Sequence, residues 1–391
     1  MNEKDSIKSA IIGTNVFARK VKVLIDQLYS QYMLQTQKGC IIENVAYVSE
    51  QDSPDLLDGC EIISIDRFIE QYNAGNIEIV IIPEPLYSGS LSFLSYFIMR
   101  GVSINSVYMV STEMIAKEKY SLDEAENVLE SYLSFPQLPY LEFHVADHCN
   151  LNCKGCEHYS PLVEKEVYTE PDEFEKSVVQ LKKYINRIGM IRILGGEPLL
   201  NPKLLDFIRI TREQFPDSII YIVTNAILIK RWGSDLLGVM KENDIRFSIS
   251  YYPPLQPKMG EITQYLEEEG IEYDISPLIK EFRYKQYTEA CADKEYSFYT
   301  CPQAHCNNLY RGKIAACFMP FTTHYFNEKY NLSIPEDGAI DLYDESLNTE
   351  ELKLKLLIPF ERCSYCGDTV ERPWESVKRR DDSPITDWVV K

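Results

Sequence analysis

HCNLNCKGC, residues 148–156, places Cys149, Cys153 and Cys156 at the spacing CxxxCxxC, directly after an apolar stretch at 140–145 that predicts a β-strand. Three thiolates on one short loop can each bind one iron of a cubane cluster, which leaves the fourth iron without a protein ligand. An iron of that kind can bind a substrate or a cofactor. The loop therefore predicts an iron–sulfur site with an open coordination position.

A structural zinc site is the alternative for this loop. Zinc sites of that kind take four ligands, and only three cysteines are close together in the sequence here. The fourth ligand would then be His144, His148 or His158.

The cysteine content and the N-terminus indicate the compartment. The chain of 391 residues has eleven cysteines, nine of them after residue 148, and residues 1–10 contain no apolar signal segment. No stretch reaches the roughly 18 apolar residues of a membrane span. We therefore expect a cytoplasmic protein without a membrane partner, in which clustered thiols stay reduced and bind metal. The formal net charge of −20 disfavours binding to nucleic acid.

Glycine and polar motifs follow the next predicted strands. Apolar stretches at 191–194, 219–223, 245–249 and 271–275 continue the strand series. The candidate cofactor-binding residues at or beside the carboxyl ends of these strands are Gly195, Gly196, Glu197, Pro198, Thr224, Asn225, Ser248 and Ser250. In parallel barrels the carboxyl ends of the strands form one rim that carries the chemistry, so we expect these motifs beside the cysteine loop.

A helix is expected after the first of these strands. Its single apolar face, at spacings of four and three, would consist of Phe174, Val178, Leu181, Ile185 and Ile188. Five such strand–helix units predict a partial, (β/α)6 TIM-like barrel over 140–285, because a complete barrel of eight units takes about 250 residues.

Residues 1–135 predict a separate α/β domain. Apolar runs alternate with helical patterns over the first 111 residues, which predicts a Rossmann-like open parallel sheet. The turn at 13–18, GTNVFA, partly matches the dinucleotide fingerprint GxGxxG/A. Two interpretations of this domain therefore remain: it binds a nucleotide or nucleotide sugar, or it has a structural or partner-docking role. Residues 121–124, SLDE, fit the capping box of a short helix, and Pro136 and Pro139 mark the end of the domain.

The segments CNLNCKGC, GGEP and VTNA together resemble the radical S-adenosylmethionine (radical SAM) enzymes over 140–276. The resemblance implies that Cys149, Cys153 and Cys156 hold a 4Fe–4S cluster whose open iron chelates the methionine group of S-adenosylmethionine. The GGEP segment matches the methionine-binding motif of that family, in which Glu197 suits a cationic amine. The reduced cluster is then expected to pass an electron to the sulfonium, and a 5′-deoxyadenosyl radical abstracts hydrogen from the substrate.

One position departs from the family pattern. Many members carry an aromatic residue just before the third cysteine, where this chain has Gly155. Tyr159 and His158 are the candidates for contact with the adenine, and packing of the loop is the alternative role for both.

Residues 286–391 predict a small α+β extension that holds metal. The sequence at 312–317, GKIAAC, has the Gly-x4-Cys form of a hairpin, and Cys363 and Cys366 form a close pair. These features resemble the twitch or SPASM extensions of radical SAM enzymes, the shorter twitch form being the better match. The resemblance implies one auxiliary 4Fe–4S cluster.

The ligands of that cluster are chosen from six cysteines. We expect Cys317, Cys363 and Cys366, with Cys301 or Cys306 as the fourth, and a four-cysteine zinc site is the alternative. Cys291 is expected to be a bystander, and the charged tail after Trp374 to be peripheral.

The leading interpretation is a radical SAM enzyme that takes electrons from a reductant such as flavodoxin or ferredoxin. The sequences CKGCEHYSPL and GGEPLLNP, with the α/β domain in front of them, favour a sugar or nucleotide sugar as the substrate. A peptide-modifying enzyme is the alternative within the family. An iron–sulfur electron carrier or redox sensor is the non-catalytic alternative.

Overall fold

The computed structural model describes residues 6–36, 41–83, 88–117, 121, 128–377 and 383–390. The chain divides into two compact units, residues 1–136 and residues 137–391, each a mixture of helices and strands. Among the described residues, no helix has both the length and the apolar character needed to cross a membrane.

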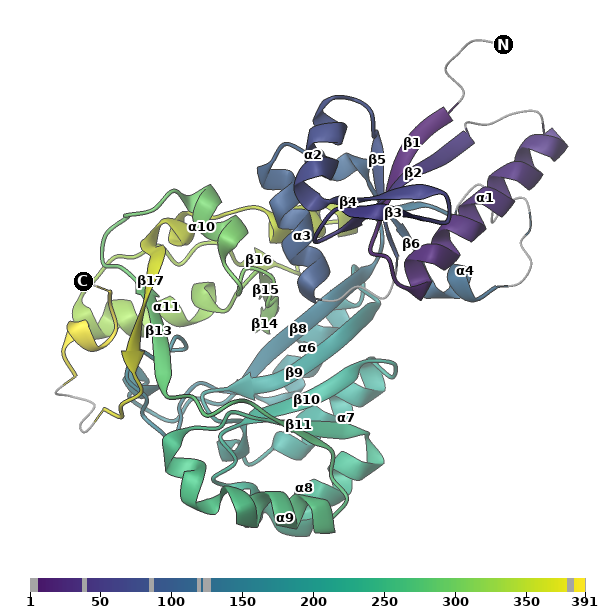
Figure 1. Cartoon of the computed structure of the whole chain (residues 1–391). Coiled ribbons are helices and arrows are strands. Elements are labelled where there is room, and N and C mark those ends of the chain that lie inside the picture. The colour runs from purple at the N-terminus through teal and green to yellow at the C-terminus, as the bar shows by residue number, and fades with distance from the viewer. Residues whose placement is uncertain are drawn as a thin grey trace. The chain divides into compact units, whose positions relative to one another are not determined.

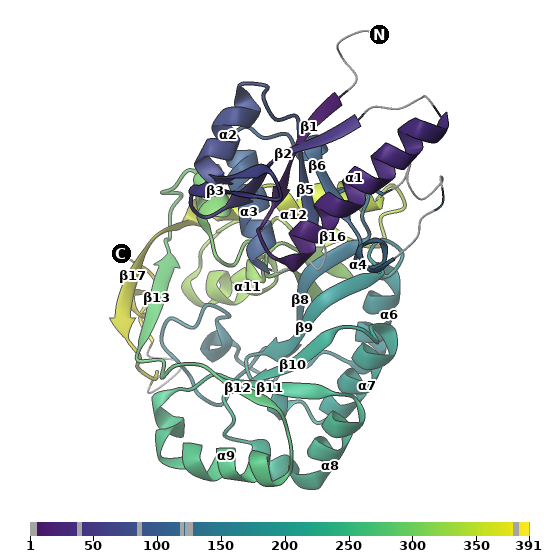
Figure 2. The same cartoon turned by 45° about the vertical axis from the view of Figure 1, so that its right-hand side comes forward.

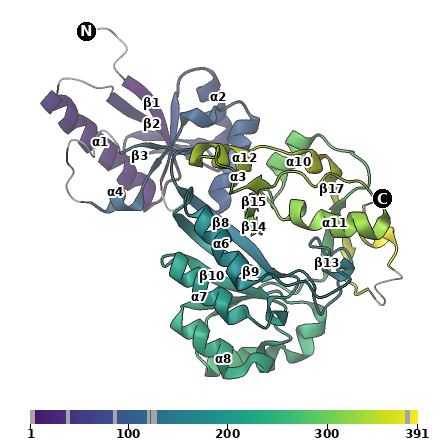
Figure 3. The same ribbon diagram turned by 180° about the vertical axis from the view of Figure 1, so that it is seen from behind.

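The first unit is a seven-stranded sheet with helices on both faces. Its strands are β1 (Ser6–Ile12), β2 (Ile41–Ser49), β3 (Ser53–Leu57), β4 (Cys60–Ser64), β5 (Ile79–Pro83), β6 (Val107–Val110) and β7 (Glu130–Ser131). They lie in the order β3-β4-β2-β1-β5-β6-β7, and the five from β4 to β6 are parallel. Helices α1 (Val16–Thr36) and α4 (Thr112–Ala116) cover one face, and α2 (Ile65–Asn73) and α3 (Ser88–Met99) the other (Figures 1 and 3).

Two local features of this unit add to what the sequence predicts: a pair of antiparallel strands and the hydrogen bonding of the turn after β1. The antiparallel pair β3 and β4 was not expected from the sequence, and its turn places Asp58 and Gly59 at positive φ. At the turn after β1, the side chain of Asn15 accepts a hydrogen bond from the Ala18 N–H over 3.0 Å. Asn15 thus occupies one N–H at the start of α1, in the position where the dinucleotide fingerprint has a glycine. The helix expected from 121–124 falls mostly on residues 122–127, outside the described residues.

The second unit contains an eight-stranded sheet in the order β12-β11-β10-β9-β8-β14-β15-β16. The five predicted strands are present as β8 (Gln137–Ala146), β9 (Arg187–Gly195), β10 (Ile219–Thr224), β11 (Ile245–Ile249) and β12 (Tyr273–Ile275), and all pair in parallel. Within the described residues, the outer strands β12 and β16 do not pair, so the sheet is open.

Four helices pack on one face of this sheet: α6 (Pro171–Leu181), α7 (Leu204–Gln214), α8 (Ile229–Glu242) and α9 (Met259–Glu268) (Figure 2). Their apolar side chains and those of β8 to β11 form one buried core. Helix α6 is shorter than its predicted apolar face, because it ends at Leu181 and Ile188 already lies in β9, opposite Leu138 of β8. The apolar spacing continues past the helix because the next strand supplies buried residues to the same core.

The C-terminal third shares the sheet of the second unit. Strand β14 (Asn308–Tyr310) pairs in parallel with β8, and β15 (Lys313–Ala315) and β16 (Ile340–Asp341) extend the edge. One sheet therefore contains strands from both 140–285 and 286–391, the two segments that the sequence predicts to be separate. The predicted hairpin is present, and Arg311 and Gly312 take positive φ at its tip, as a tight two-residue turn requires.

The C-terminal third also contains a two-stranded antiparallel sheet of β13 (Glu281–Gln286) and β17 (Cys366–Pro373), and three further helices. They are α10 (Lys294–Thr300), α11 (Met319–Tyr330) and α12 (Thr349–Leu357). The expectation of a peripheral tail is wrong for 383–390, because Trp388 and Val389 are each 2% exposed and pack with Tyr159 and Phe326. Three apolar residues in succession, 388–390, are enough to bury this end.

Candidate functional site

The two glycines at the end of β9 fit the backbone of the cysteine loop. The N–H of Gly196 donates to the Ala146 carbonyl over 2.7 Å, and the N–H of Glu197 donates to the His148 carbonyl over 3.1 Å. A Cβ atom on Gly195 would lie 2.1 Å from the Ala146 oxygen, and one on Gly196 would lie 2.3 Å from the His148 oxygen. The pair therefore lets β9 approach the start of the cysteine loop more closely than any other residue could.

Glu197 connects the ends of two strands. Its carboxylate is fully buried and accepts hydrogen bonds from the Thr224 hydroxyl (2.7 Å), the Asn225 N–H (2.9 Å) and the Leu199 N–H (3.0 Å). Burial raises the pKa of Glu197 to about 7, although the three donors oppose this shift. The acid thus fixes Thr224 and Asn225 at the end of β10, on the same edge as the GGEP turn.

Asn225 joins this edge to the cysteine loop. Its Nδ2 donates to Asn150 Oδ1 over 2.6 Å and lies 3.8 Å from Cys149 Sγ. Pro198 begins the short 3-10 helix Pro198–Leu200 and is buried. Ser248 lies within β11, and Ser250 follows it with its N–H donating to the Thr224 carbonyl. The predicted rim residues therefore meet at the carboxyl ends of β8 to β11.

The three thiols of the loop are largely shielded from water. Burial raises the pKa of Cys153 to about 12, and it raises the pKa of Cys149 and of Cys156 as well. Thiols of that kind stay protonated until a metal displaces the proton. Cys149 Sγ accepts from the Leu151 N–H over 3.5 Å, and Cys153 Sγ accepts from the indole N–H of Trp374 over 3.2 Å.

The histidines near the loop have other partners. His148 Nδ1 accepts from the Val167 N–H over 3.1 Å, His144 Nδ1 lies 3.4 Å from an Asp147 oxygen, and His158 packs against Phe318. Within the described part of the chain, no three His, Cys, Asp or Glu side chains converge closely enough to hold a single metal ion. A cubane has a separate iron for each thiolate, so its ligands need not meet at one point.

The space beside Gly155 is filled by an aromatic ring from a distant strand. Gly155 has φ +66°, and a Cβ atom there would lie 2.4 Å from the ring of Tyr284 in β13. Tyr159 is 2% exposed, stacks on Phe326 and donates its hydroxyl hydrogen to Gln286 over 2.9 Å. Tyr159 therefore packs in the core, which is the second of the two roles expected for it.

A second group of four thiols surrounds a small cavity in the C-terminal third. Cys301, Cys317, Cys363 and Cys366 all line it, and Lys285 and Arg362 contribute cationic groups to its wall. Cys306 is not among the residues that line this cavity. The structure thus groups Cys301 with the three cysteines expected from the sequence.

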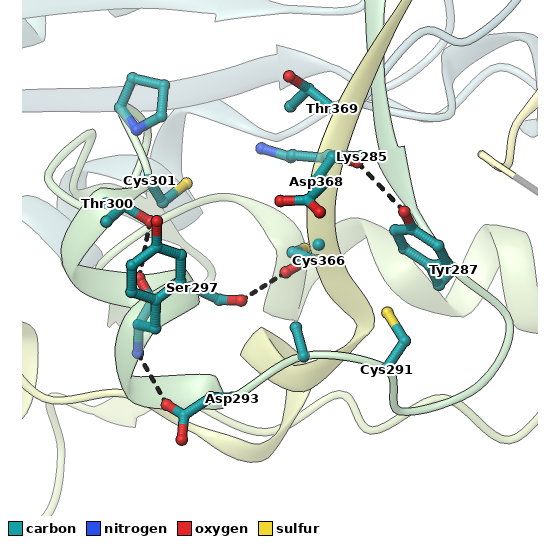
Figure 4. A pocket seen from close by; sticks show the side chains of 14 residues that line it. Lys285, Tyr287, Cys291, Asp293, Ser297, Thr300, Cys301, Cys366, Asp368 and Thr369 are labelled. Atoms are coloured by element: carbon teal, nitrogen blue, oxygen red, sulfur yellow. Dashed lines mark hydrogen bonds between the residues drawn. The ribbon is translucent and has the colours of Figure 1, made fainter.

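A larger pocket of about 500 Å³ lies beside the four-thiol cavity (Figure 4). It shares Lys285, Cys301 and Cys366 with the four-thiol cavity, and Cys291 lines it as well. Lys285 is 9% exposed and forms an ion pair with Glu157 over 3.3 Å. Of the three cysteines that line this pocket, only Cys291 is exposed.

Four residues of these sites were not singled out from the sequence: Tyr284, Lys285, Arg362 and Trp374. Trp374 is 221 positions from the cysteine that it contacts, and Tyr284 is 129 positions from Gly155. No spacing rule connects positions so far apart, because the contact depends on the pairing of β13 with β17.

Comparison with known proteins assigns the region of the cysteine loop. Residues 144–252 match the family described as the Radical SAM superfamily. Among curated proteins, GTP 3′,8-cyclase of Heliobacterium modesticaldum is 32% identical over 100 residues, which are 25% of this chain and 30% of that protein. GTP 3′,8-cyclase of Sulfurimonas denitrificans is 36% identical over 102 residues, with the same two shares. The chain thus spans about a third of the length of these curated relatives.

Solved structures show weaker similarity. BtrN in complex with AdoMet and 2-DOIA is 15% identical with a TM-score of 0.37, covering 59% of this chain and 92% of that one. SuiB of Streptococcus suis bound to S-adenosylmethionine is 20% identical with a TM-score of 0.31, covering 42% and 41%.

The family match begins in β8, before the first cysteine of the loop, and ends after β11, so it contains the cysteine loop and every predicted rim residue. Residues 144–252 therefore form a radical SAM domain.

Proposed function

We propose that this protein cleaves S-adenosylmethionine reductively and uses the resulting 5′-deoxyadenosyl radical to abstract hydrogen from a substrate. The observation that carries the proposal is the junction of Cys149, Asn225 and Glu197 at one edge of the sheet, inside the segment that matches the superfamily. A 4Fe–4S cluster bound there supplies the electron for this cleavage.

The chain's own residues would share the work as follows. Cys149, Cys153 and Cys156 hold the cluster. The edge formed by Gly195, Gly196, Glu197, Pro198, Thr224, Asn225, Ser248 and Ser250 binds S-adenosylmethionine. Glu197 supports this assignment because its three hydrogen bonds hold Thr224 and Asn225 beside the GGEP turn. Glu197 and Cys153 are buried, which limits the access of water to the site.

We assign an auxiliary 4Fe–4S cluster to Cys301, Cys317, Cys363 and Cys366. Two features support it: the four thiols share one cavity, and two buried cations line that cavity beside them. Thiolate ligands carry negative charge, which Lys285 and Arg362 would partly neutralise. A zinc site with four cysteine ligands is the alternative for the same thiols.

Metal analysis separates these assignments. With two clusters, reconstituted protein should contain about eight irons and a matching amount of sulfide per chain. About four irons with one zinc would retain the radical SAM cluster and reject the auxiliary one. Zinc alone, at one or two per chain, would reject both.

We propose a sugar or nucleotide sugar as the substrate class, in a cytoplasmic enzyme reduced by flavodoxin or ferredoxin. The parallel α/β sheet of the first unit supports this choice over a peptide substrate, because a leader peptide would need a dedicated docking module. Calorimetry with a panel of nucleotide sugars and a candidate leader peptide tests it. Binding of the peptide alone would reverse the preference.

An electron carrier or redox sensor is the second candidate, and the retained GGEP edge argues against it. A protein that only transfers electrons has no evident need for a carboxylate and two glycines built against the cluster loop. Calorimetry with S-adenosylmethionine on the reconstituted protein decides between the two. Binding supports the enzyme, and its absence supports the carrier.

A further inference from the structure

We propose that Trp374 sets the reduction potential of the cluster held by Cys149, Cys153 and Cys156, by donating its indole N–H to the Cys153 sulfur. This inference rests on the proposed function, since it requires Cys153 to be a cluster ligand. It makes Trp374 a positioning residue that acts through the cysteine.

The indole is delivered by a short backbone pairing. Residues 374–377, here called the C-terminal strap, follow β17 and lie antiparallel to the cysteine loop, with a β-bridge between Cys153 and Ser376. The Lys154 N–H donates to the Glu375 carbonyl over 2.8 Å, and the Val377 N–H donates to the Asn152 carbonyl over 2.7 Å. The strap, from the far end of the chain, therefore fixes the loop on both sides of its second cysteine, Cys153.

Side chains strengthen the same attachment. Ser376 Oγ donates to the Leu151 carbonyl over 3.2 Å, and Lys154 forms an ion pair with Glu375 over 2.9 Å. Val377 is 7% exposed, so the strap is also held by apolar burial. The Trp374 N–H itself donates to the Lys280 carbonyl over 2.7 Å, so the backbone is held both at Trp374 and after it, and the indole N–H lies toward the sulfur.

The contact lies in surroundings where a hydrogen bond has a strong electrostatic effect. Trp374 Nε1 lies 3.2 Å from Cys153 Sγ, and Cys153 is 7% exposed. The ring of Tyr252 lies 6.3 Å from the ring of Trp374. Since little water reaches the sulfur, few other donors compete with the indole for it.

The sign of the effect follows from charge. One-electron reduction makes the cluster and its thiolates more negative, so an N–H donor to a ligand sulfur stabilises the reduced form more than the oxidised form. Trp374 therefore raises the reduction potential. The bond is present in both redox states, so only its strengthening on reduction counts. A gain of the size of a typical net hydrogen bond changes the reduction equilibrium about fivefold, which is about 40 mV at 59 mV per tenfold for one electron.

Substitution of Trp374 by phenylalanine distinguishes the effect of the indole N–H from the effect of the aromatic ring. Trp374→Phe keeps an aromatic side chain against Tyr252 and removes the donor. Trp388→Phe is the matched control. The indole N–H of Trp388 also donates a hydrogen bond, but to Ser383 Oγ over 3.0 Å and not to a cysteine. Both variants and the unmodified protein would be reconstituted as full chains, and the midpoint potential of the cluster followed by EPR during a dithionite titration.

In Trp374→Phe we expect a midpoint potential about 40 mV more negative than in the unmodified protein. In Trp388→Phe we expect an unchanged midpoint potential. An unchanged midpoint in Trp374→Phe, with the cluster intact, overturns the inference and leaves the proposed function in place. If the unmodified protein assembles no cluster with these cysteines, the proposed function itself fails.

A second measurement needs no change at Trp374. The chain has three tryptophans, so Trp232→Phe with Trp388→Phe leaves Trp374 as the sole indole. With 15N-labelled indole in this double variant, pulsed EPR of the reduced cluster should detect a 15N coupling. Its absence would contradict the contact, including in the case where Trp374→Phe fails to assemble a cluster.

Discussion

Arg362 donates from Nη1 to the sulfur of Cys366 over 3.3 Å, and no carboxylate in the described part of the chain pairs with its guanidinium. The side chain is 1% exposed, with further bonds to Thr323 Oγ1 and the Met319 sulfur at 3.0 and 3.4 Å. A buried cation without an acid is costly unless anionic ligands share its cavity. Thiolates bound to a metal cluster would supply that charge.

Arg362→Gln should therefore weaken the auxiliary cluster. We expect the reconstituted variant to hold about four irons per chain in place of about eight, and the rise in melting temperature on loading to shrink, since removing one partner of a buried charge pair costs about 3–5 kcal/mol. Arg212→Gln is the control, because the Arg212 guanidinium is likewise held by several hydrogen bonds, here to backbone carbonyls, but is remote from these thiols in the fold. Equal loading of both variants would contradict the assigned role.

Cys301→Ala and Cys306→Ala distinguish the fourth ligand. Because Cys301 lines the four-thiol cavity and Cys306 does not, only the first change should remove the auxiliary cluster. The measurement is iron and sulfide per chain, with Mössbauer spectra to separate the two clusters. Loss of iron in Cys306→Ala alone would move the assignment to Cys306.

Gly196→Ala should prevent assembly of the cluster at the cysteine loop. Its Cβ would lie 2.3 Å from the His148 oxygen, so the end of β9 and the loop must separate. Gly238→Ala in α8 is the matched control, because nothing lies within 4 Å of its Cβ and alanine favours helix by about 1 kcal/mol. We expect the control to load iron normally and to melt at the same or a higher temperature. Normal loading of Gly196→Ala would refute the role given to this close approach.

The buried acid Glu197 predicts a pH dependence of stability in the metal-free protein. Its pKa is raised from 4.5 to about 7, so between these values the folded protein holds a proton that the unfolded chain has released. The free energy of unfolding should therefore fall as pH rises from about 4.5 to about 7, by about 3 kcal/mol. Urea titrations across this range, compared with Glu197→Gln, measure the contribution. An identical pH profile in the variant would exclude it.

The sequence predicted the parts of the site that are local in the chain. The five strands from β8 to β12 and the rim residues could be read from apolar stretches and the motifs at their ends, because parallel strands bring their carboxyl ends together. The hairpin before Cys317 was equally local, since Gly312 permits the tight turn. The helix end at Leu181 was missed because Ile185 and Ile188 keep the helical spacing while belonging to a turn and to β9.

Contacts between distant segments could not be predicted. The two glycines before Glu197 were predicted only as cofactor-binding residues, and the structure shows them against the backbone of Ala146 and His148. The tail was expected to be peripheral, yet the C-terminal strap pairs with the cysteine loop. Its composition gives no sign of this, since the pairing rests on backbone hydrogen bonds, which the side chains of the strap only supplement.

The central claim is that Cys149, Cys153 and Cys156 hold a cluster that cleaves S-adenosylmethionine. The most direct measurement is the amount of 5′-deoxyadenosine formed by anaerobically reconstituted protein with dithionite and S-adenosylmethionine, compared with the triple variant Cys149→Ala, Cys153→Ala, Cys156→Ala. The account predicts 5′-deoxyadenosine from the unmodified protein and only background from the triple variant. Equal amounts from the two proteins would contradict it.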